Sequence, residues 1–501
     1  MPSLAVTFAV FTALLALPPA APQHQWPQVD SDTAVGLRAV DCWFEPDSTL
    51  PPIECYRMQV PERHDSANTR IISFPVMVIR AENRQRQRAP LLHLGAGGPG
   101  APMYLDRRET ALDLAWSLNQ ASIAQGRDLV AIDPRGTGMA RPRLACDEFV
   151  TGERRRLEQH LTLSQMRGSV VSDYRRCIDR YLADGVDFSG YNSFAVARDI
   201  ESLRRTIGID RWVLLGISYG ANYALTLADL YPDTIEAMVL DSAYVARTDT
   251  SQRYLDWLIK PYQRLFDYCE YDPQCDAPLP RVRERFWKLH ASLERDPLVI
   301  DFAHGRDRIA LVLDGARFLE AIMQGVYGVE IYRDLPRIIT QLERGEYSAL
   351  RPYLRQHVDY MLDTDWGDVS EMAHYCYETG PFMDYERIRA SFAELPPGHL
   401  RDTAEFFLDW PDHCAQMKID SAAPQLVPSR PVQAPTLFLH GRFDSITPLA
   451  HVLEIQEYFQ RPQLVGFDLG HSILTSSHCA LGSAAKFIDN PAIPYAQLRC
   501  D

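Results

Sequence analysis

The stretch Trp212-Val213-Leu214-Leu215-Gly216-Ile217-Ser218-Tyr219-Gly220-Ala221 decides the fold. Its apolar, partly β-branched first half predicts a buried strand. The residues after it, up to Leu230, are rich in Ala and Leu and end before Pro232, which predicts a helix. The Gly-Ile-Ser-Tyr-Gly between them fits the G-x-S-x-G nucleophile elbow, a sharp turn in which the serine backbone is strained and flanking glycines leave room. We expect Ser218 to be a nucleophile and the Tyr219 N–H to face a developing oxyanion. The alternative is a plain glycine-bounded turn with a surface serine.

Length and composition describe a folded protein larger than one ordinary domain. The chain has 501 residues, of which 46% are hydrophobic and 23% charged, so we expect a core with a large insertion or second domain. The formal net charge is −15, which argues against nucleic acid or an anionic membrane surface as a partner.

The first 21 residues differ in composition from the rest. Ala5–Leu17 is a continuous apolar run, too short to span a bilayer comfortably, and Pro18–Ala21 follows it. This resembles a secretory signal peptide over residues 1–21, although no Lys or Arg precedes the apolar run. A buried N-terminal helix is the alternative. We therefore expect a secreted or periplasmic protein with no stable membrane anchor.

The ten cysteines are even in number and form no C-x-x-C pair, and none has a histidine at zinc spacing, so we expect disulfides and no metal site. They are Cys42, Cys55, Cys146, Cys177, Cys269, Cys275, Cys376, Cys414, Cys479 and Cys500. Sequence does not fix their connectivity, but pairing in chain order closes five loops most simply. Buried free thiols are the alternative.

A glycine-rich loop follows the short predicted strand Leu91–Leu94. Gly95–Gly100 lacks the Lys-Ser/Thr of a phosphate-binding loop and the G-x-G-x-x-G spacing. Glycines at such a strand end let backbone amides approach a substrate carbonyl. We expect Gly97 and Gly98 to contribute to an oxyanion hole, with a plain flexible turn as the alternative.

Apolar strands alternate with helical stretches over most of the chain, which predicts a doubly wound, mostly parallel α/β sheet. Residues 55–60 and 71–79 predict two antiparallel strands at a sheet edge, where Pro75 is tolerated. From about residue 243 to 431 the strand pattern gives way to aromatic-rich helical sequence. We expect core segments at 41–242 and 432–501, with a mainly helical cap at 243–431 folding over the serine.

Two residues complete a candidate catalytic triad. Asp444 follows a predicted strand, and His471 lies in a Gly-His loop after the last one. The order Ser218…Asp444…His471 is that of α/β-hydrolases. Asp241, at the end of the preceding core strand, is the alternative acid. The alternative bases are His440 and His478.

Together these motifs resemble the prolyl and tripeptidyl aminopeptidase family of α/β-hydrolases, closest to its exported tripeptidyl-peptidase branch with a TAP-like C-terminal region. The resemblance covers roughly residues 41–501. It is carried by the G-x-S-x-G and Gly-His motifs and, more specifically, by Gly97–Gly100 (GGPG), Asp133–Gly138 (DPRGTG) and Gly441–Pro448 (GRFDSITP).

The resemblance implies an acyl-enzyme on Ser218, completed by Asp444 and His471, and an acidic cap residue that binds the free N-terminal amine of a peptide. Glu378 matches the family's Cys-x-acid cap segment and is the expected amine-binding residue. Prolyl aminopeptidases have His before GGPG, whereas this chain has Ala96, which puts proline specificity in doubt.

The sequence thus predicts an exported serine exopeptidase without a cofactor, acting on peptides with a free N-terminus. A carboxylesterase acting on small or aromatic esters is the alternative, because the same triad serves both reactions. A binding module without enzymatic activity is the third hypothesis.

Overall fold

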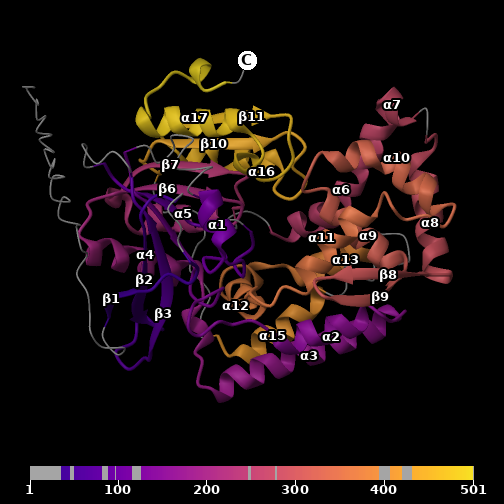
Figure 1. Cartoon of the computed structure of the whole chain (residues 1–501), viewed down its shortest axis with the longest axis horizontal. Coiled ribbons are helices and arrows are strands. Elements are labelled where there is room, and N and C mark those ends of the chain that lie inside the picture. The colour runs from indigo at the N-terminus through magenta and orange to yellow at the C-terminus, as the bar shows by residue number, and fades with distance from the viewer. Residues whose placement is uncertain are drawn as a thin grey trace, which may run out of the picture.

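The computed structural model describes residues 35–45, 50–81, 88–95, 97–114, 126–245, 250–276, 279–393, 407–419 and 431–499. Within these residues nine strands form one sheet, which lies in the left half of the view in Figure 1. Its strands are β1 (Gly36–Val40), β2 (Ile53–Pro61), β3 (Ile71–Ile79), β4 (Leu91–His93), β5 (Leu129–Ile132), β6 (Trp212–Ile217), β7 (Ile235–Asp241), β10 (Thr436–Gly441) and β11 (Pro462–Phe467). The predicted signal peptide at 1–21 lies outside the described residues.

The sheet is mostly parallel, as expected, and its order is β1-β2-β3-β5-β4-β6-β7-β10-β11. The antiparallel pairs are β1 with β2, β2 with β3, and β3 with β5. The prediction that β3 lies at the edge is wrong, because β5 pairs with its far side. Pro75 is nevertheless accommodated, since the pairing with β5 begins one residue later, at Val76.

Helices cover both faces of the sheet, which confirms the doubly wound α/β class. One core cluster joins α4 (Ser193–Ile207) and α5 (Gly220–Leu230) to one face. A second cluster joins α1 (Arg108–Asp113) and α17 (His478–Asp489) to the other face. The short helix α16 (Leu449–Ile455) contributes Val452 to the first cluster.

The segment between β7 and β10 forms a mainly helical body beside the sheet (Figure 1). Its helices are α6 (Thr250–Tyr271), α7 (Pro273–Asp276), α8 (Val282–Arg295), α9 (Gly315–Gly325), α10 (Glu330–Leu342), α11 (Arg351–Met361), α12 (Asp368–Glu378), α13 (Tyr385–Ala393) and α15 (Trp410–Met417). It also contains an antiparallel hairpin, β8 (Leu298–His304) with β9 (Asp307–Leu313), which the sequence analysis did not predict. The hairpin buries the alternate residues Ile300 and Phe302.

Two helices that precede the nucleophile strand also pack on this body. Helices α2 (Asp147–Arg156) and α3 (Leu163–Ala183) share a core cluster with residues of α12 and α15, and Figure 1 shows α2 and α3 alongside α15. The expected cap boundary at 243 therefore omits a second insertion, located between β5 and β6.

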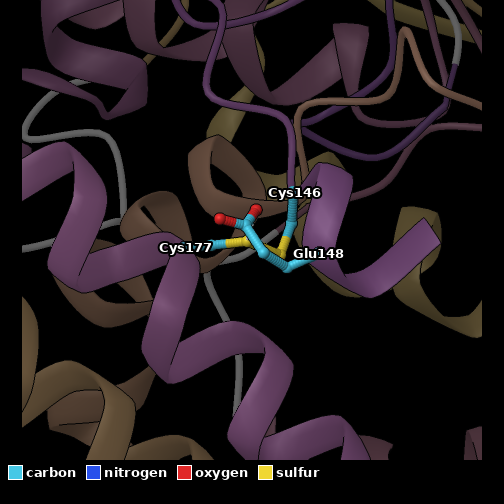
Figure 2. Close-up of side chains that lie close together, drawn as sticks. All are labelled: Cys146, Glu148 and Cys177. Carbon is cyan, nitrogen blue, oxygen red and sulfur yellow. Dashed lines mark hydrogen bonds between the residues drawn. A yellow bond between two sulfur atoms is a disulfide. The ribbon is translucent and has the colours of Figure 1, made fainter. Parts of the chain in front are cut away.

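Four disulfides in the described residues follow the expected chain order: Cys42–Cys55, Cys146–Cys177, Cys269–Cys275 and Cys376–Cys414. Cys479 is also disulfide-bonded, and its expected partner Cys500 lies outside the described residues. Glu148 lies beside Cys146 and Cys177, as Figure 2 shows. Because the two sulfurs are bonded to each other, they are not thiolate ligands for a metal. None of the described helices has the length and apolarity needed to span a bilayer.

Candidate active site

Ser218 lies in a strained turn between β6 and α5. Its φ is +52°, in the left-handed region that a residue with a side chain rarely occupies. Its N–H donates to the Asp241 carbonyl at 2.9 Å, and Tyr219 begins the turn into the helix. The predicted strand, sharp turn and helix are therefore all present.

The two glycines of the motif are required by close backbone approach. A methyl group added at Gly216 would lie 2.6 Å from the carbonyl of Gly220. One added at Gly220 would lie 2.5 Å from the carbonyl oxygen of Gly95. Side chains at either position would thus push apart the elbow, its helix and the glycine-rich loop.

His471 and Asp444 contact each other, whereas the described hydrogen bonds include none between the Ser218 hydroxyl and the His471 ring. Nδ1 of His471 lies 2.9 Å from Oδ2 of Asp444, and both side chains are almost fully buried. The hydroxyl of Thr447 lies 2.8 Å from the same carboxylate oxygen and 3.2 Å from Nδ1. A carboxylate on Nδ1 fixes the ring orientation and leaves Nε2 for proton transfer.

The Asp444 carboxylate is held in its ionised form. Burial by itself raises its pKa, but the charge and hydrogen bond of His471, together with other donors, bring the pKa below its ordinary value. Among those donors are the backbone N–H groups of Ile446 and Thr447, at 2.9 and 2.8 Å.

Asp241 holds the loops of the site together and does not contact the His471 ring in the described hydrogen bonds. Its carboxylate accepts the N–H groups of Ile473 and Leu474 at 3.1 and 2.8 Å, just after the histidine. Its carbonyl accepts the Ser218 N–H. The serine and histidine loops are therefore anchored on one residue. Asp241, the alternative acid, therefore stabilises the two loops and does not orient the imidazole. Burial raises the pKa of its carboxyl to about 6.

The alternative bases are placed unfavourably. His440 is 1% exposed inside β10, and burial lowers the pKa of its ring. His478 begins α17 and is exposed. The geometry therefore favours His471.

The candidate oxyanion loop packs against the elbow. The carbonyl group of Gly97, in this loop, occupies the position expected for the substrate oxyanion. The Tyr219 N–H donates to the carbonyl oxygen of Gly97 at 3.1 Å. An oxyanion bound by the Tyr219 N–H must displace this carbonyl. Gly97 has a φ of +118°, and because glycine has no side chain, rotation of its peptide group costs little free energy. His93 braces the loop, since its Nδ1 accepts the Gly95 N–H at 3.0 Å. Ala96 lies outside the described residues.

Asp133 and Arg135 have supporting positions. Asp133 accepts the N–H groups of Met103 and Met139 at 2.6 and 2.9 Å, which joins the loops after β4 and β5. Arg135 is fully enclosed and forms a two-pronged ion pair with Asp199.

Glu378 has different surroundings from those expected of an amine-binding residue. Its side chain is 0% exposed. One oxygen accepts the Ser193 N–H, and the other accepts from the hydroxyls of Ser193 and Tyr219, both at 3.0 Å, and from the Asn222 amide at 3.3 Å. The structure therefore does not support the predicted contact between Glu378 and a substrate amine.

A second acid on the same helix was missed by the sequence analysis. Glu371 precedes Glu378 by seven residues, two helical turns, and so lies on the same face of α12. Its Oε2 accepts the Trp366 indole N–H at 2.8 Å, and a methyl group added at Gly98 would lie 3.0 Å from its Oε1. The seven-residue spacing between Glu371 and Glu378 was the feature of the sequence from which this second acid could have been predicted.

Tyr327 covers the histidine from the cap. Its carbonyl accepts the His471 N–H at 2.7 Å, and the two rings meet edge to face with centroids 5.4 Å apart. Tyr327 as a whole residue is 43% exposed. Cap residues from α12 and from the turn after α9 thus border both the glycine loop and the histidine.

Comparison with known proteins gives matches in both parts of the core. Residues 96–280 match the family described as alpha/beta hydrolase fold, and residues 403–500 match the family described as TAP-like protein. Serine protease Hip1 of Mycobacterium tuberculosis is 24% identical over 436 residues, covering 83% of this chain and 80% of that protein. Tripeptidyl aminopeptidase of Streptomyces lividans is 22% identical over 465 residues, covering 86% and 79%.

Solved structures that resemble this one include a serine hydrolase from the bacterium Cycloclasticus zankles, with 12% identity and a TM-score of 0.37 over 87% of this chain and 98% of that chain.

Proposed function

Because this chain belongs to the α/β-hydrolase serine peptidases related to tripeptidyl aminopeptidase, we propose that it is an exopeptidase that cleaves peptide bonds near a free N-terminus. The observation that carries the proposal is a partly buried cap carboxylate, Glu371, beside the candidate oxyanion loop. The relatives named above support a serine peptidase of this kind.

The proposed reaction proceeds through an acyl-enzyme on Ser218. Its Oγ attacks the scissile carbonyl carbon while His471 takes the hydroxyl proton, and Asp444 stabilises the resulting imidazolium. The Tyr219 N–H and the glycine loop bind the oxyanion once the Gly97 carbonyl has turned away. His471 then gives its proton to the leaving amine, and water releases the acyl group by the same steps in reverse.

Glu371 is the proposed recogniser of the substrate's N-terminal ammonium. No described residue donates a hydrogen bond to its Oε1, the oxygen nearer the glycine loop. Burial raises the pKa of this carboxyl, and the partial desolvation strengthens its attraction to an ammonium group. A second acid, Asp368, lies close by: burial and then the charge of Glu371 raise the pKa of its carboxyl to about 8.

A matched pair of substrates tests this function. Wild-type enzyme should hydrolyse a tripeptide anilide with a free N-terminus and leave its N-acetylated twin almost untouched, with Ser218→Ala as the blank. Glu371→Gln should lower kcat/KM for the free peptide by roughly 10- to 100-fold, the equivalent of one charge-assisted hydrogen bond. Equal cleavage of both peptides would contradict amine recognition. Cleavage of an ester alone would indicate the carboxylesterase instead.

Export is proposed on two grounds. Nine of the ten cysteines are disulfide-bonded in the described chain, a state typical of oxidising compartments. The first 21 residues also have the composition of a secretory signal. Mass spectrometry of the N-terminus in culture medium or periplasm tests the proposal, and an uncleaved cytoplasmic protein would contradict it.

A further inference from the structure

A buried polar cluster includes the side chain of Tyr219, the residue after Ser218, and contains no member of the candidate triad. Glu378 from α12, Ser193 from α4, Tyr219 from the elbow and Asn222 from α5 form it. Glu378 and Asn222 are 0% exposed, and so is Ser193. One carboxylate therefore joins the cap helix to both helices that support Ser218.

The hydrogen-bonding roles in this cluster are fixed by chemistry. The Ser193 backbone N–H and the Asn222 amide NH₂ can only donate. The group at position 378 must therefore accept at both of its oxygens, as a carboxylate does. Burial raises the pKa of Glu378, and the hydrogen bonds from Ser193, Tyr219 and Asn222 oppose that rise. With these donors in place, the carboxylate is already satisfied without a ligand.

The cluster fixes Tyr219, whose backbone N–H faces the candidate oxyanion hole. Its hydroxyl is 3.0 Å from Glu378 Oε2. Its ring packs edge to face on Tyr223 and stacks on Tyr244, with both centroid distances 5.2 Å. Because the Tyr219 ring and hydroxyl are both held in place, the backbone N–H of the same residue has little freedom to reorient. Its nitrogen lies 3.1 Å from the carbonyl oxygen of Gly97.

We propose that Glu378 is a positioning residue: through the Tyr219 hydroxyl it sets the direction of the Tyr219 N–H that binds the oxyanion, and it does not touch the substrate. The inference rests on the proposed acyl transfer at Ser218, and it holds for peptide and ester substrates alike. It also gives the cap a role in the chemical step, because α12 carries Glu378.

Glu378→Gln tests the inference. Glutamine keeps the shape of the side chain, but its NH₂ group faces either the Ser193 N–H or the Asn222 NH₂, which are also donors. We expect kcat to fall about 10- to 100-fold on the free tripeptide anilide and on a small ester, because loss of an entire oxyanion donor costs about 10²- to 10³-fold. KM and the preference for a free over an acetylated N-terminus should stay unchanged. The affinity of a peptide boronic acid should fall with kcat, while that of a product tripeptide should not.

Tyr219→Phe separates positioning from folding, because it removes only the hydroxyl and leaves Ser193 and Asn222 on the carboxylate. It should show the same fall in kcat, and the double variant with Glu378→Gln should be no worse than the more severe single variant. Ser202→Ala, which removes a hydroxyl bonded to Arg198 O on α4, serves as the control with wild-type kinetics.

Two outcomes would overturn the inference. One is a rise in KM for the free peptide at unchanged kcat, which would make Glu378 an amine-binding residue. The other is unchanged kcat in Tyr219→Phe. Neither bears on Glu371→Gln, whose effect on the choice between free and acetylated peptide tests the proposed function separately.

Discussion

Oδ2 of Asp444 lies 2.9 Å from Nδ1 of His471, whereas the carboxylate of Asp241 is bound to the backbone N–H groups of Ile473 and Leu474. Two buried carboxylates therefore serve the same histidine loop in different ways. Asp444 orients the ring, and Asp241 holds the loop.

This division predicts unequal effects of the two carboxamide substitutions. Asp444→Asn should lower kcat by about 10⁴-fold, because the amide favours the wrong imidazole tautomer. Asp241→Asn keeps one acceptor oxygen and should cost about tenfold, the equivalent of one lost hydrogen bond. Steady-state kinetics on one anilide measures both, and a larger loss in Asp241→Asn would reverse the assignment of the acid.

The raised pKa of Glu371 predicts a pH dependence of substrate binding. The ionised carboxylate binds the ammonium, so binding weakens as pH falls through a pKa higher than that of an ordinary glutamate. KM for the free tripeptide anilide should therefore begin to rise at a pH above that at which an ordinary glutamate is protonated, while the substrate amine stays protonated. Glu371→Gln should abolish this rise. A KM that is flat in wild-type enzyme as the pH falls would contradict the role of Glu371.

The disulfides should contribute unequally to stability. Cys376–Cys414 spans 38 residues and joins α12 to α15, whereas Cys269–Cys275 spans six. By loop-closure entropy, replacing both cysteines with serine should lower the free energy of unfolding by about 4 kcal/mol for the first pair and about 2 kcal/mol for the second. Denaturant unfolding measures the difference. Equal losses would show that loop entropy is not the main term.

Crowding at the elbow predicts opposite outcomes for two Gly→Ala substitutions. Gly216→Ala places a methyl group 2.6 Å from the Gly220 carbonyl and should destabilise the fold by about 2 kcal/mol or more and abolish activity. Gly168 is exposed in α3 with no atom near its added methyl, so Gly168→Ala should stabilise by about 0.5–1 kcal/mol. Thermal unfolding compares them. Gly216→Ala with native stability and activity would contradict the described turn.

Local patterns of the chain predicted the strand, turn and helix around Ser218, the glycine loop and the chain order of Asp444 and His471. These features depend on residues close in sequence, such as the small residues that the turn requires. The position of Glu378 was not predictable in this way. Its motif places it on the cap helix, but only packing determines which acid of that helix is enclosed by Ser193 and Tyr219.

The packing of α2 and α3 on the cap was not predictable for the same reason. Nothing local in α2 and α3 shows that they pack on α12 and α15, because an amphipathic face does not specify its partner. Pro75 led to a wrong prediction, because proline is typical of an edge strand. Here β3 is an interior strand, and it pairs with β5 only after Pro75.

Labelling with a fluorophosphonate, followed by intact-mass and peptide mass spectrometry, tests directly whether Ser218 is the nucleophile. The reagent reacts with an activated serine. We expect a single adduct on Ser218, none in Ser218→Ala, and strongly slowed labelling in Asp444→Asn. An adduct on another serine, or no adduct on folded wild-type protein, would contradict this prediction.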